Sequence, residues 1–253
     1  MPLPTEKTKR IFNFYGEKIL LWGAPKKGKT TLVSELGDKI VFIATESGQS
    51  KVEAYVVPVK TWEEFEATIK EVKADPRFEM SCIDTIDALW QLYLTYFLKK
   101  HKVEHEGEIA YKGHDMIKRG FISVFYELQA VGKGFIFLAH DRVAEDDSGV
   151  KGPRRCQPNL PYDKQHIMRD TIEGMCDFIW YLTDGASIGA DGKAAMGRVI
   201  RTAASNEYVA GSRFPIIDPI PLVDGDPKAS AKKIYNAYQH AAASATKKNE
   251  GGK

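Results

Sequence analysis

Short apolar runs alternate with amphipathic segments along the first half of the chain. The apolar runs have the length of buried strands and cover residues 18–22, 40–46, 80–84 and 134–140. Between them, apolar side chains recur at helical spacing over residues 29–37, 61–72, 88–100 and 116–131. Because alternating strands and helices pack as a covered sheet, the pattern predicts an α/β fold with a mostly parallel central sheet and helices on both faces.

The pattern changes after residue 140. Residues 141–171 are rich in Asp, Gly, Pro and Arg and have little hydrophobic periodicity, which predicts a long loop that is either functional or disordered. Further on, Asp191 and Gly192 stand between apolar runs at residues 180–183 and 198–202. A turn of this composition between two apolar runs predicts a hairpin of antiparallel edge strands, so the sheet is expected to be mixed.

The C-terminal part differs from the rest in charge. A helix is expected over residues 229–243, followed by a frayed end. Residues 228–253 contain six lysines and one acidic residue, Glu250, so they carry a net charge of +5 and leave −3 for residues 1–227 out of a total of +2. We therefore expect one domain over residues 1–227, with a C-terminal helix and a basic flexible tail over residues 228–253. Any contact with nucleic acid must come from local basic clusters.

Composition narrows the class of protein. With 253 residues, 43% of them hydrophobic and 28% charged, the chain can bury a substantial core. No apolar run approaches the roughly 20 residues that cross a bilayer, and the first residues lack a secretory signal. The three cysteines, Cys82, Cys156 and Cys176, form no CxxC pair. We expect a soluble cytoplasmic protein with no membrane contact, disulfide framework or structural zinc.

A glycine-rich motif follows the first predicted strand and precedes a predicted helix. It matches GxxxxGK[ST] and consists of Gly23, Ala24, Pro25, Lys26, Lys27, Gly28, Lys29 and Thr30, with Thr31 next. In this context the backbone amides of the loop surround a β-phosphate, Lys29 reaches the β and γ oxygens, and the Thr30 hydroxyl can bind Mg²⁺. The motif predicts an ATP site with Mg²⁺, and Thr31 is included among the nucleotide contacts.

Acidic residues end two of the predicted strands. Asp84 is the expected second Mg²⁺ ligand beside Thr30, although it could instead cap the helix that follows. Thr85 stands directly after Asp84, where the AAA+ class has the glutamate that activates water. Glu46 is the candidate base instead, because it ends the strand after the P-loop helix and is followed by a polar turn. A solvated loop acid is the alternative reading of Glu46.

Together these features resemble the RecA-like ATPase core. The resemblance rests on the glycine loop, on Glu46, on the IDT sequence around Asp84, and on His140 at the end of the strand GFIFLAH. It extends over about residues 17–215 and is closest to small phage-encoded RecA-core proteins linked to single-strand annealing and recombination, described as phage nucleotide-binding or AAA-type ATPases. It implies a RecA-like P-loop NTPase fold and Mg²⁺-dependent ATP hydrolysis.

The resemblance also implies roles for single residues. Glu46 corresponds to the glutamate that orients water toward the γ-phosphate. His140 takes the place of a glutamine that senses this phosphate and signals to a DNA-binding loop, unless it is a strand-end histidine satisfied by backbone groups. In this family a neighbouring subunit supplies a cation to the site. Arg201 is the first candidate and Arg213 the second, and either could instead be an exposed edge-strand arginine.

The segment after His140 corresponds to the family's DNA-contacting loop. Its candidate DNA contacts are Lys151, Arg154, Arg155 and Arg169. Acidic residues equal basic ones in number over residues 141–171, so only the KGPRR cluster favours a phosphate contact, and a solvated loop is the alternative.

The expected function is Mg²⁺-dependent ATP hydrolysis coupled to single-stranded DNA binding in recombination or annealing. The resemblance implies head-to-tail assembly into a homo-oligomer or filament, with a single-strand binding protein as a further partner. Two alternatives stay open. One is a P-loop small-molecule kinase, such as a nucleotide kinase, with residues 141–171 as its lid. The other is a nucleotide-gated DNA-binding or loader module with very slow hydrolysis.

Overall fold

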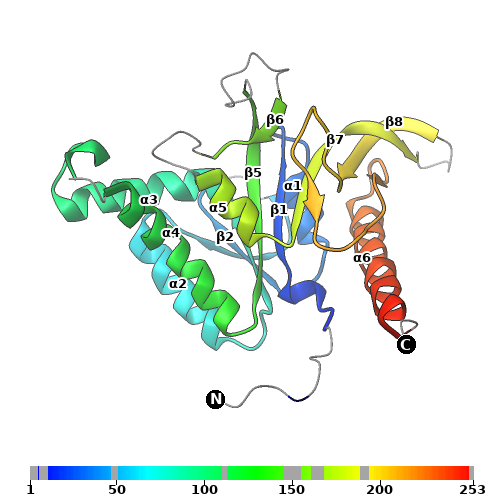
Figure 1. Cartoon of the computed structure of the whole chain (residues 1–253), viewed down its shortest axis with the longest axis horizontal. Coiled ribbons are helices and arrows are strands. Elements are labelled where there is room, and N and C mark those ends of the chain that lie inside the picture. The colour runs from blue at the N-terminus through cyan, green and yellow to red at the C-terminus, as the bar shows by residue number, and fades with distance from the viewer. Residues whose placement is uncertain are drawn as a thin grey trace.

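The central strands of the sheet run parallel, as the alternating pattern predicts. The computed structural model describes residue 5 and residues 11–46, 51–109, 113–144, 155–160, 168–188 and 194–250. Within these residues a ten-stranded sheet has the main order β10-β8-β7-β1-β5-β4-β2-β3 (Figure 1). The parallel members are β1 (Lys18–Gly23), β2 (Ile40–Ala44), β3 (Tyr55–Pro58), β4 (Met80–Asp84), β5 (Gly134–Ala144) and β7 (Phe178–Ile188).

Antiparallel strands complete the sheet and make it mixed. They are β6 (Arg155–Pro158), β8 (Ala194–Arg201), β9 (Gly211–Ser212) and β10 (Ile220–Pro221). The strand β8 pairs with β7 over its whole length, so the expected pair of antiparallel strands is confirmed. Its connecting turn at Asp191 and Gly192 lies outside the described residues.

Successive side chains of the strands point to opposite faces of the sheet, and both faces are covered. Leu20 and Phe137 face one side, whereas Ile19 and Leu138 face the other. The first face packs against α2 (Trp62–Ala74), α3 (Ile86–His101), α4 (Gly113–Ala130) and α5 (Met168–Met175). The second packs against η1 (Phe14–Gly16), α1 (Lys29–Ser34) and α6 (Pro227–Glu250).

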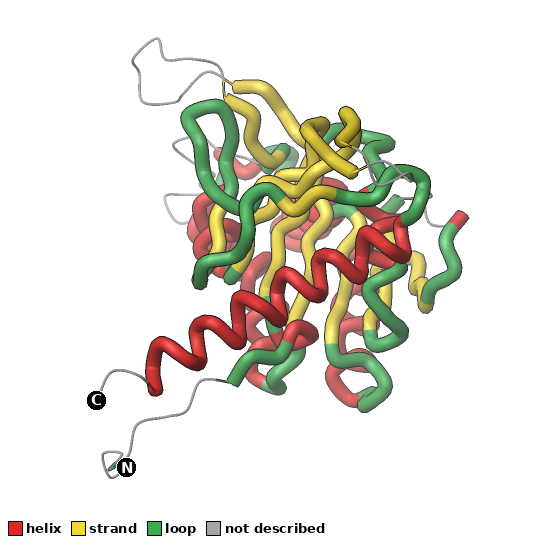
Figure 2. The backbone as a smooth tube through the Cα atoms, turned by 90° about the vertical axis from the view of Figure 1, so that its right-hand side faces the viewer, coloured by secondary structure: helices red, strands yellow, loops and turns green. Residues whose placement is uncertain are grey.

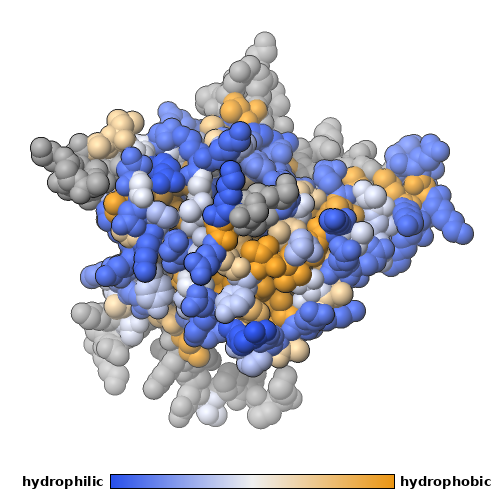
Figure 3. All heavy atoms as spheres, turned by 180° about the vertical axis from the view of Figure 1, so that it is seen from behind, coloured by the Kyte–Doolittle hydropathy of each residue, from blue (hydrophilic) through white to orange (hydrophobic). Residues whose placement is uncertain are grey.

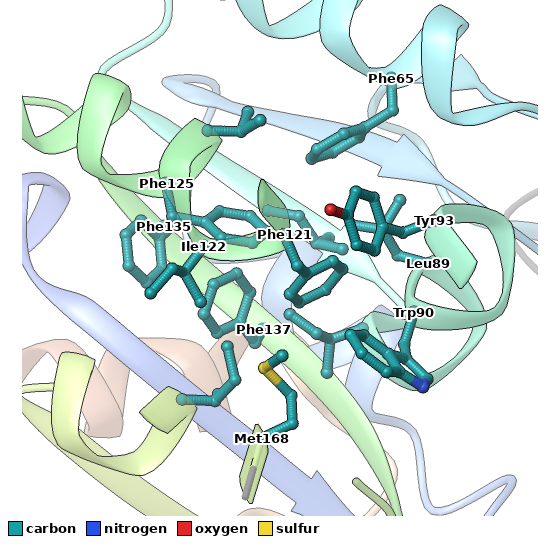
Figure 4. Close-up of a cluster of buried hydrophobic side chains, with 14 of the residues drawn as sticks. Phe65, Leu89, Trp90, Tyr93, Phe121, Ile122, Phe125, Phe135, Phe137 and Met168 are labelled. Carbon is teal, nitrogen blue, oxygen red and sulfur yellow. The ribbon is translucent and has the colours of Figure 1, made fainter. Parts of the chain in front are cut away.

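Aromatic side chains fill the larger of the two layers. Figure 4 shows rings from three helices and from β5 pointing toward one another. The rings of Phe125 and Phe137 meet edge to face with centroids 4.7 Å apart, and those of Trp90 and Phe121 do so at 5.2 Å. Such contacts add to the stabilisation from apolar burial, so this layer fixes α3 and α4 against the sheet.

The C-terminal helix is longer than expected and packs on the body. It starts at Pro227 and continues to Glu250, where a frayed end was predicted after residue 243, because its alanine-rich sequence favours helix. Ile234 and Tyr238 are buried, and the Tyr238 hydroxyl donates to Glu17 Oε1 at 2.5 Å. Figure 2 shows this helix lying across the strands.

The prediction of a loop over residues 141–171 is wrong for the residues of this segment that the structure describes. β5 continues to Ala144 and pairs in antiparallel fashion with β6, and α5 begins at Met168. The polar sequence of β6 gave no apolar alternation, although Gln157 is buried and Cys156 packs against the core. The short edge strand β3 was also missed. Residues 145–154 and 161–167 lie outside the described part of the chain.

The face of the molecule drawn in Figure 3 is mainly hydrophilic. Seen from behind in Figure 3, blue residues surround an apolar patch near the middle of that face. Among the described helices none is long and apolar enough to cross a membrane.

Candidate nucleotide site

A polar cleft lies where β1, β2, β4 and β5 end. Its volume is about 520 Å³, and it is lined by Pro25, Lys26, Gly28, Lys29, Thr30, Thr31, Glu46, Lys51, Val52, Asp84, Thr85 and His140. Ligands of open α/β sheets bind outside the carboxyl ends of the strands, and this cleft lies at that edge of the sheet. A groove of about 590 Å³ between residues 215–221 and α6 is larger, but its lining is mainly apolar. The polar cleft is therefore the candidate nucleotide site.

The two glycines of the motif are required by space and backbone. A Cβ atom on Gly23 would lie 2.3 Å from the carbonyl oxygen of Leu182, so a side chain here would push β7 away. Gly28 has a φ of +88°, which favours glycine, and precedes α1. A Cβ atom on Gly28 would lie 2.6 Å from Arg198 Nη1. These constraints explain why the loop can approach both its neighbouring strand and a phosphate closely.

Lys29 is buried at the mouth of the loop. Its side chain is only 6% exposed, and its Nζ donates to the carbonyl oxygens of Gly23 at 2.7 Å and Ala24 at 3.0 Å. Burial lowers the pKa of Lys29, and the nearby carboxylates, with Asp141 the strongest and Asp84 next, oppose that shift. The ammonium is thus held at the loop that would carry the phosphates.

The predicted magnesium ligands lie together. Thr30 Oγ1 donates to Asp84 Oδ2 at 2.8 Å, and Asp84 is 5% exposed. Mg²⁺ takes oxygen ligands and keeps several waters and phosphate oxygens, so one hydroxyl and one carboxylate are a suitable protein contribution. The described residues contain no group of three or more His, Cys, Asp or Glu that could hold a metal by themselves. The donor set fits Mg²⁺ bound together with a nucleotide.

Glu46 is held beside this pair by two threonines. Thr85 Oγ1 donates to Glu46 Oε1 at 3.2 Å, and the Thr85 amide donates to Thr45 Oγ1 at 2.9 Å. The Thr45 amide in turn donates to the Asp84 carbonyl oxygen at 2.9 Å. The ends of β2 and β4 are therefore tied together, which brings Glu46 to the cleft. Thr85 also caps α3 through the amide of Ala88.

His140 lines the same cleft and contacts α3. His140 Nδ1 lies 2.8 Å from Asp87 Oδ2. The backbone carbonyl oxygen of His140 accepts from the backbone N–H of Asn159 at 2.8 Å. His140 thus connects the cleft with the segment that follows β6. Sequence reasoning missed Asp87, although its position three residues after Asp84, in the first turn of the helix, was a usable signal.

Two residues of the β7–β8 pair hold the loop at Lys27. Asp184 accepts from Lys27 Nζ, and Arg198 Nη1 donates to the Lys27 carbonyl oxygen at 3.0 Å. Sequence reasoning placed Arg198 only at the start of the apolar run over residues 198–202. No local signal reveals its contact with its own loop, which depends on the register of β8.

The predicted subunit-bridging arginines do not line the cleft of their own chain. Arg201 lies opposite Tyr181, two strands away from Trp22. Arg213 Nε pairs with Asp177 Oδ1 at 2.7 Å, at the end of the sheet opposite the P-loop. Their expected role toward a neighbouring subunit stays a prediction.

Of the predicted DNA contacts, the structure describes Arg155 and Arg169, and neither lines the cleft. Lys151 and Arg154 lie outside the described residues. Arg155 Nη2 donates to the carbonyl oxygens of Ser205 and Tyr208, both at 3.2 Å. The Arg169 side chain is only 12% exposed and donates to Gln157. Both guanidinium groups therefore hold internal segments together.

Comparison with known proteins identifies the family. Solved structures similar to this chain include the RadB recombinase, with 16% identity, a TM-score of 0.43 and coverage of 74% of this chain and 80% of that one. A KaiC-like protein from Pyrococcus horikoshii is similar with 14% identity, a TM-score of 0.44 and coverage of 85% and 88%. No curated protein matches the sequence. The AAA domain family model matches residues 16–214, the greater part of the chain, which therefore belongs to this family of P-loop ATPases.

Proposed function

We propose that this chain hydrolyses ATP with Mg²⁺ and couples the reaction to binding of single-stranded DNA in recombination or annealing. The observation that carries the ATPase part is the arrangement around the cleft. Thr30 and Asp84 are joined at 2.8 Å, and Glu46 is held 3.2 Å from Thr85 beside them. A metal position and a candidate base thus border one cleft.

The chemistry follows from these positions. Thr30 and Asp84 would hold Mg²⁺, which neutralises charge on the β and γ oxygens when bound. Lys29 supplies a second positive charge, and phosphoryl transfer depends chiefly on such positioning and charge stabilisation. Glu46 is an exposed carboxylate fixed by one hydroxyl donor, so it can orient water and accept its proton.

The acids beside Thr30 favour binding of ATP together with the metal. Asp84 and Glu46 line the cleft with Lys26, Lys29 and Lys51, and Asp84 lies directly beside Thr30. Without a cation between them, the Asp84 carboxylate would repel a phosphate bound next to Thr30. We therefore expect ATP binding to be lost when Mg²⁺ is removed with a chelator and restored when Mg²⁺ is added back.

The DNA part of the proposal is supported by His140. This residue borders the cleft, while its main chain contacts Asn159 after β6. A change at the γ-phosphate position can therefore alter the β5–β6 pair, which leads into residues 145–154. Neither Arg201 nor Arg213 lines the cleft of its own chain. In a head-to-tail assembly either arginine could therefore reach the cleft of a neighbouring subunit.

Phosphate release with and without single-stranded DNA tests the proposal. Wild-type protein should release phosphate from MgATP, and single-stranded DNA should raise the rate. The Lys29→Ala variant provides the blank for contaminating ATPases. Release that is independent of DNA over a wide concentration range would remove the DNA part and leave the ATPase part intact.

A small-molecule kinase is the second candidate. One observation favours it: another polar cleft, of about 350 Å³, lies beside Glu46 and could hold an acceptor. Transfer of the γ-phosphate to a nucleoside monophosphate, followed with labelled ATP, would support this candidate over hydrolysis.

A further inference from the structure

A second polar cleft shares Glu46 with the nucleotide cleft. Its volume is about 350 Å³, at the lower end of the roughly 300–1,000 Å³ found for ligand sites. It lies between the start of α3 and the segment after β6. Its lining includes Glu46, Asp87, Trp90, Gln91, Arg142, Asn159 and Leu160. None of the sequence motifs accounts for this cleft.

The lining combines hydrogen-bonding groups with apolar surface. Gln91 and Asn159 are exposed amides, each able to donate and accept, whereas Trp90 and Leu160 are buried apolar residues at the wall. Asp87 uses Oδ2 for His140, but its Oδ1 is buried and has no hydrogen-bond partner among the described residues. Buried polar atoms usually have a hydrogen-bond partner, so Asp87 has unused acceptor capacity at the wall of this cleft.

We propose that this cleft binds a nucleobase, an inference that rests on the proposed function. A nucleobase offers flat apolar faces and an edge of N–H and carbonyl groups. Amide side chains pair with such edges, and carboxylates accept from exocyclic amino groups. Two carboxylates, of Glu46 and Asp87, line the cleft against one guanidinium, of Arg142, so we place the base of a strand here and its phosphates outside.

A base in this position would act on the ATP site directly. It would contact Glu46, the candidate base, and Asp87, which holds His140. It would also contact the side chain of Asn159, a residue whose backbone N–H donates to the His140 carbonyl oxygen. Occupation of the cleft therefore couples to hydrolysis through residues that border both clefts.

The test compares base-bearing and abasic oligonucleotides of equal length. The variant Gln91→Ala with Asn159→Ala removes both amides, which are exposed, so folding should be retained. Gln129→Ala on α4, outside the cleft lining, is the matched control. In wild type and control, base-bearing strands should stimulate phosphate release more than abasic strands. The double variant should keep its basal rate but need about tenfold more base-bearing strand for half-maximal stimulation.

A second arm identifies the source of the base. Free nucleosides and nucleoside monophosphates replace the oligonucleotide, and competition or phosphate acceptance is measured in the same variants. If the double variant weakens the response to free nucleosides and nucleotides, the cleft binds free nucleotides. If the double variant weakens the response to base-bearing oligonucleotides, the cleft binds a base of a strand. A wild-type response that the double variant retains in full overturns the inference alone. No wild-type response in either arm overturns both this inference and the proposed DNA coupling.

Discussion

Asp184 and Arg198 lie directly opposite each other on β7 and β8, and both hold Lys27. Lys27 Nζ donates to the two Asp184 carboxylate oxygens at 2.6 and 2.5 Å, while Arg198 Nη1 donates to the Lys27 carbonyl oxygen at 3.0 Å. One cross-strand pair thus restrains the side chain and the main chain of the same P-loop residue.

Replacement of Arg198 should weaken the binding of ATP. The Arg198→Ala variant should raise the KM for ATP about tenfold with little change in kcat, because a charged donor to the loop is lost and the loop becomes less ordered. Steady-state kinetics measures both constants. Arg198→Lys should recover part of the loss, since an ammonium can still donate to one carbonyl. An effect on kcat alone would contradict a role in loop positioning.

Pairwise variants distinguish the two interactions. The Asp184 side chain is 61% exposed, so Asp184→Ala should change KM less than about threefold. In the double variant of Lys27→Ala and Asp184→Ala, the free-energy changes calculated from KM should not be additive, because both substitutions remove the same ion pair. In the double variant of Lys27→Ala and Arg198→Ala they should be additive, because Arg198 binds the Lys27 backbone carbonyl, which the alanine substitution leaves in place.

Lys29→Ala should abolish ATP binding. Lys29 is buried at the mouth of the loop, and its loss removes the ammonium that is expected to reach the β and γ oxygens. Binding of a fluorescent ATP analogue with Mg²⁺ measures the effect. Lys39→Ala removes an exposed lysine paired with Glu79 and serves as the control. Wild-type affinity in Lys29→Ala would refute the assignment of this loop.

Glu46→Gln should retain ATP but slow hydrolysis by about a hundredfold or more, because the proton acceptor is lost while the shape is kept. Thr85→Val should slow it less, since Thr85 only orients Glu46 through one hydrogen bond. Single-turnover phosphate release separates these steps from binding. If Glu46→Gln turns over at the wild-type rate, another group is the base.

The contrast between predicted and unpredicted site residues has a physical cause. Thr30 and Asp84 could be placed from sequence because a motif and the end of a parallel strand each fix a position at one edge of the sheet. Arg198 could not, because its contact with the loop depends on how β8 registers against β7. For Arg155 and Arg169, charge alone did not reveal that both guanidinium groups are used inside the fold.

Glu173 should make stability depend on pH. Burial raises its pKa from 4.5 to about 7, although Arg169 opposes the shift. The folded state therefore binds the proton more tightly than the unfolded chain, so the free energy of unfolding should fall as pH rises from about 4.5 to 7. Over this pH range Glu173 should lower the free energy of unfolding by about 3 kcal/mol.

Urea unfolding at pH 5 and pH 8 checks this value. Glu173→Gln should flatten the profile. Glu17, whose pKa burial raises to about 6, acts in the same direction, so some slope should persist. An unchanged profile in Glu173→Gln would exclude Glu173 as its source.

The basic cluster before β6 should bind the backbone of single-stranded DNA. Because Arg155 holds the carbonyl oxygens of Ser205 and Tyr208, its replacement would disturb the fold, and it is left in place.

Replacing Lys151 and Arg154 with alanine should weaken single-stranded DNA binding. It should also reduce the slope of log affinity against log salt by about 0.7 for each phosphate that is no longer neutralised. Anisotropy of a labelled oligonucleotide over a salt series measures both quantities. Basal ATP hydrolysis should persist, since the P-loop, Glu46 and Asp84 are unchanged. Unchanged affinity and slope would show that DNA, if bound, contacts another surface.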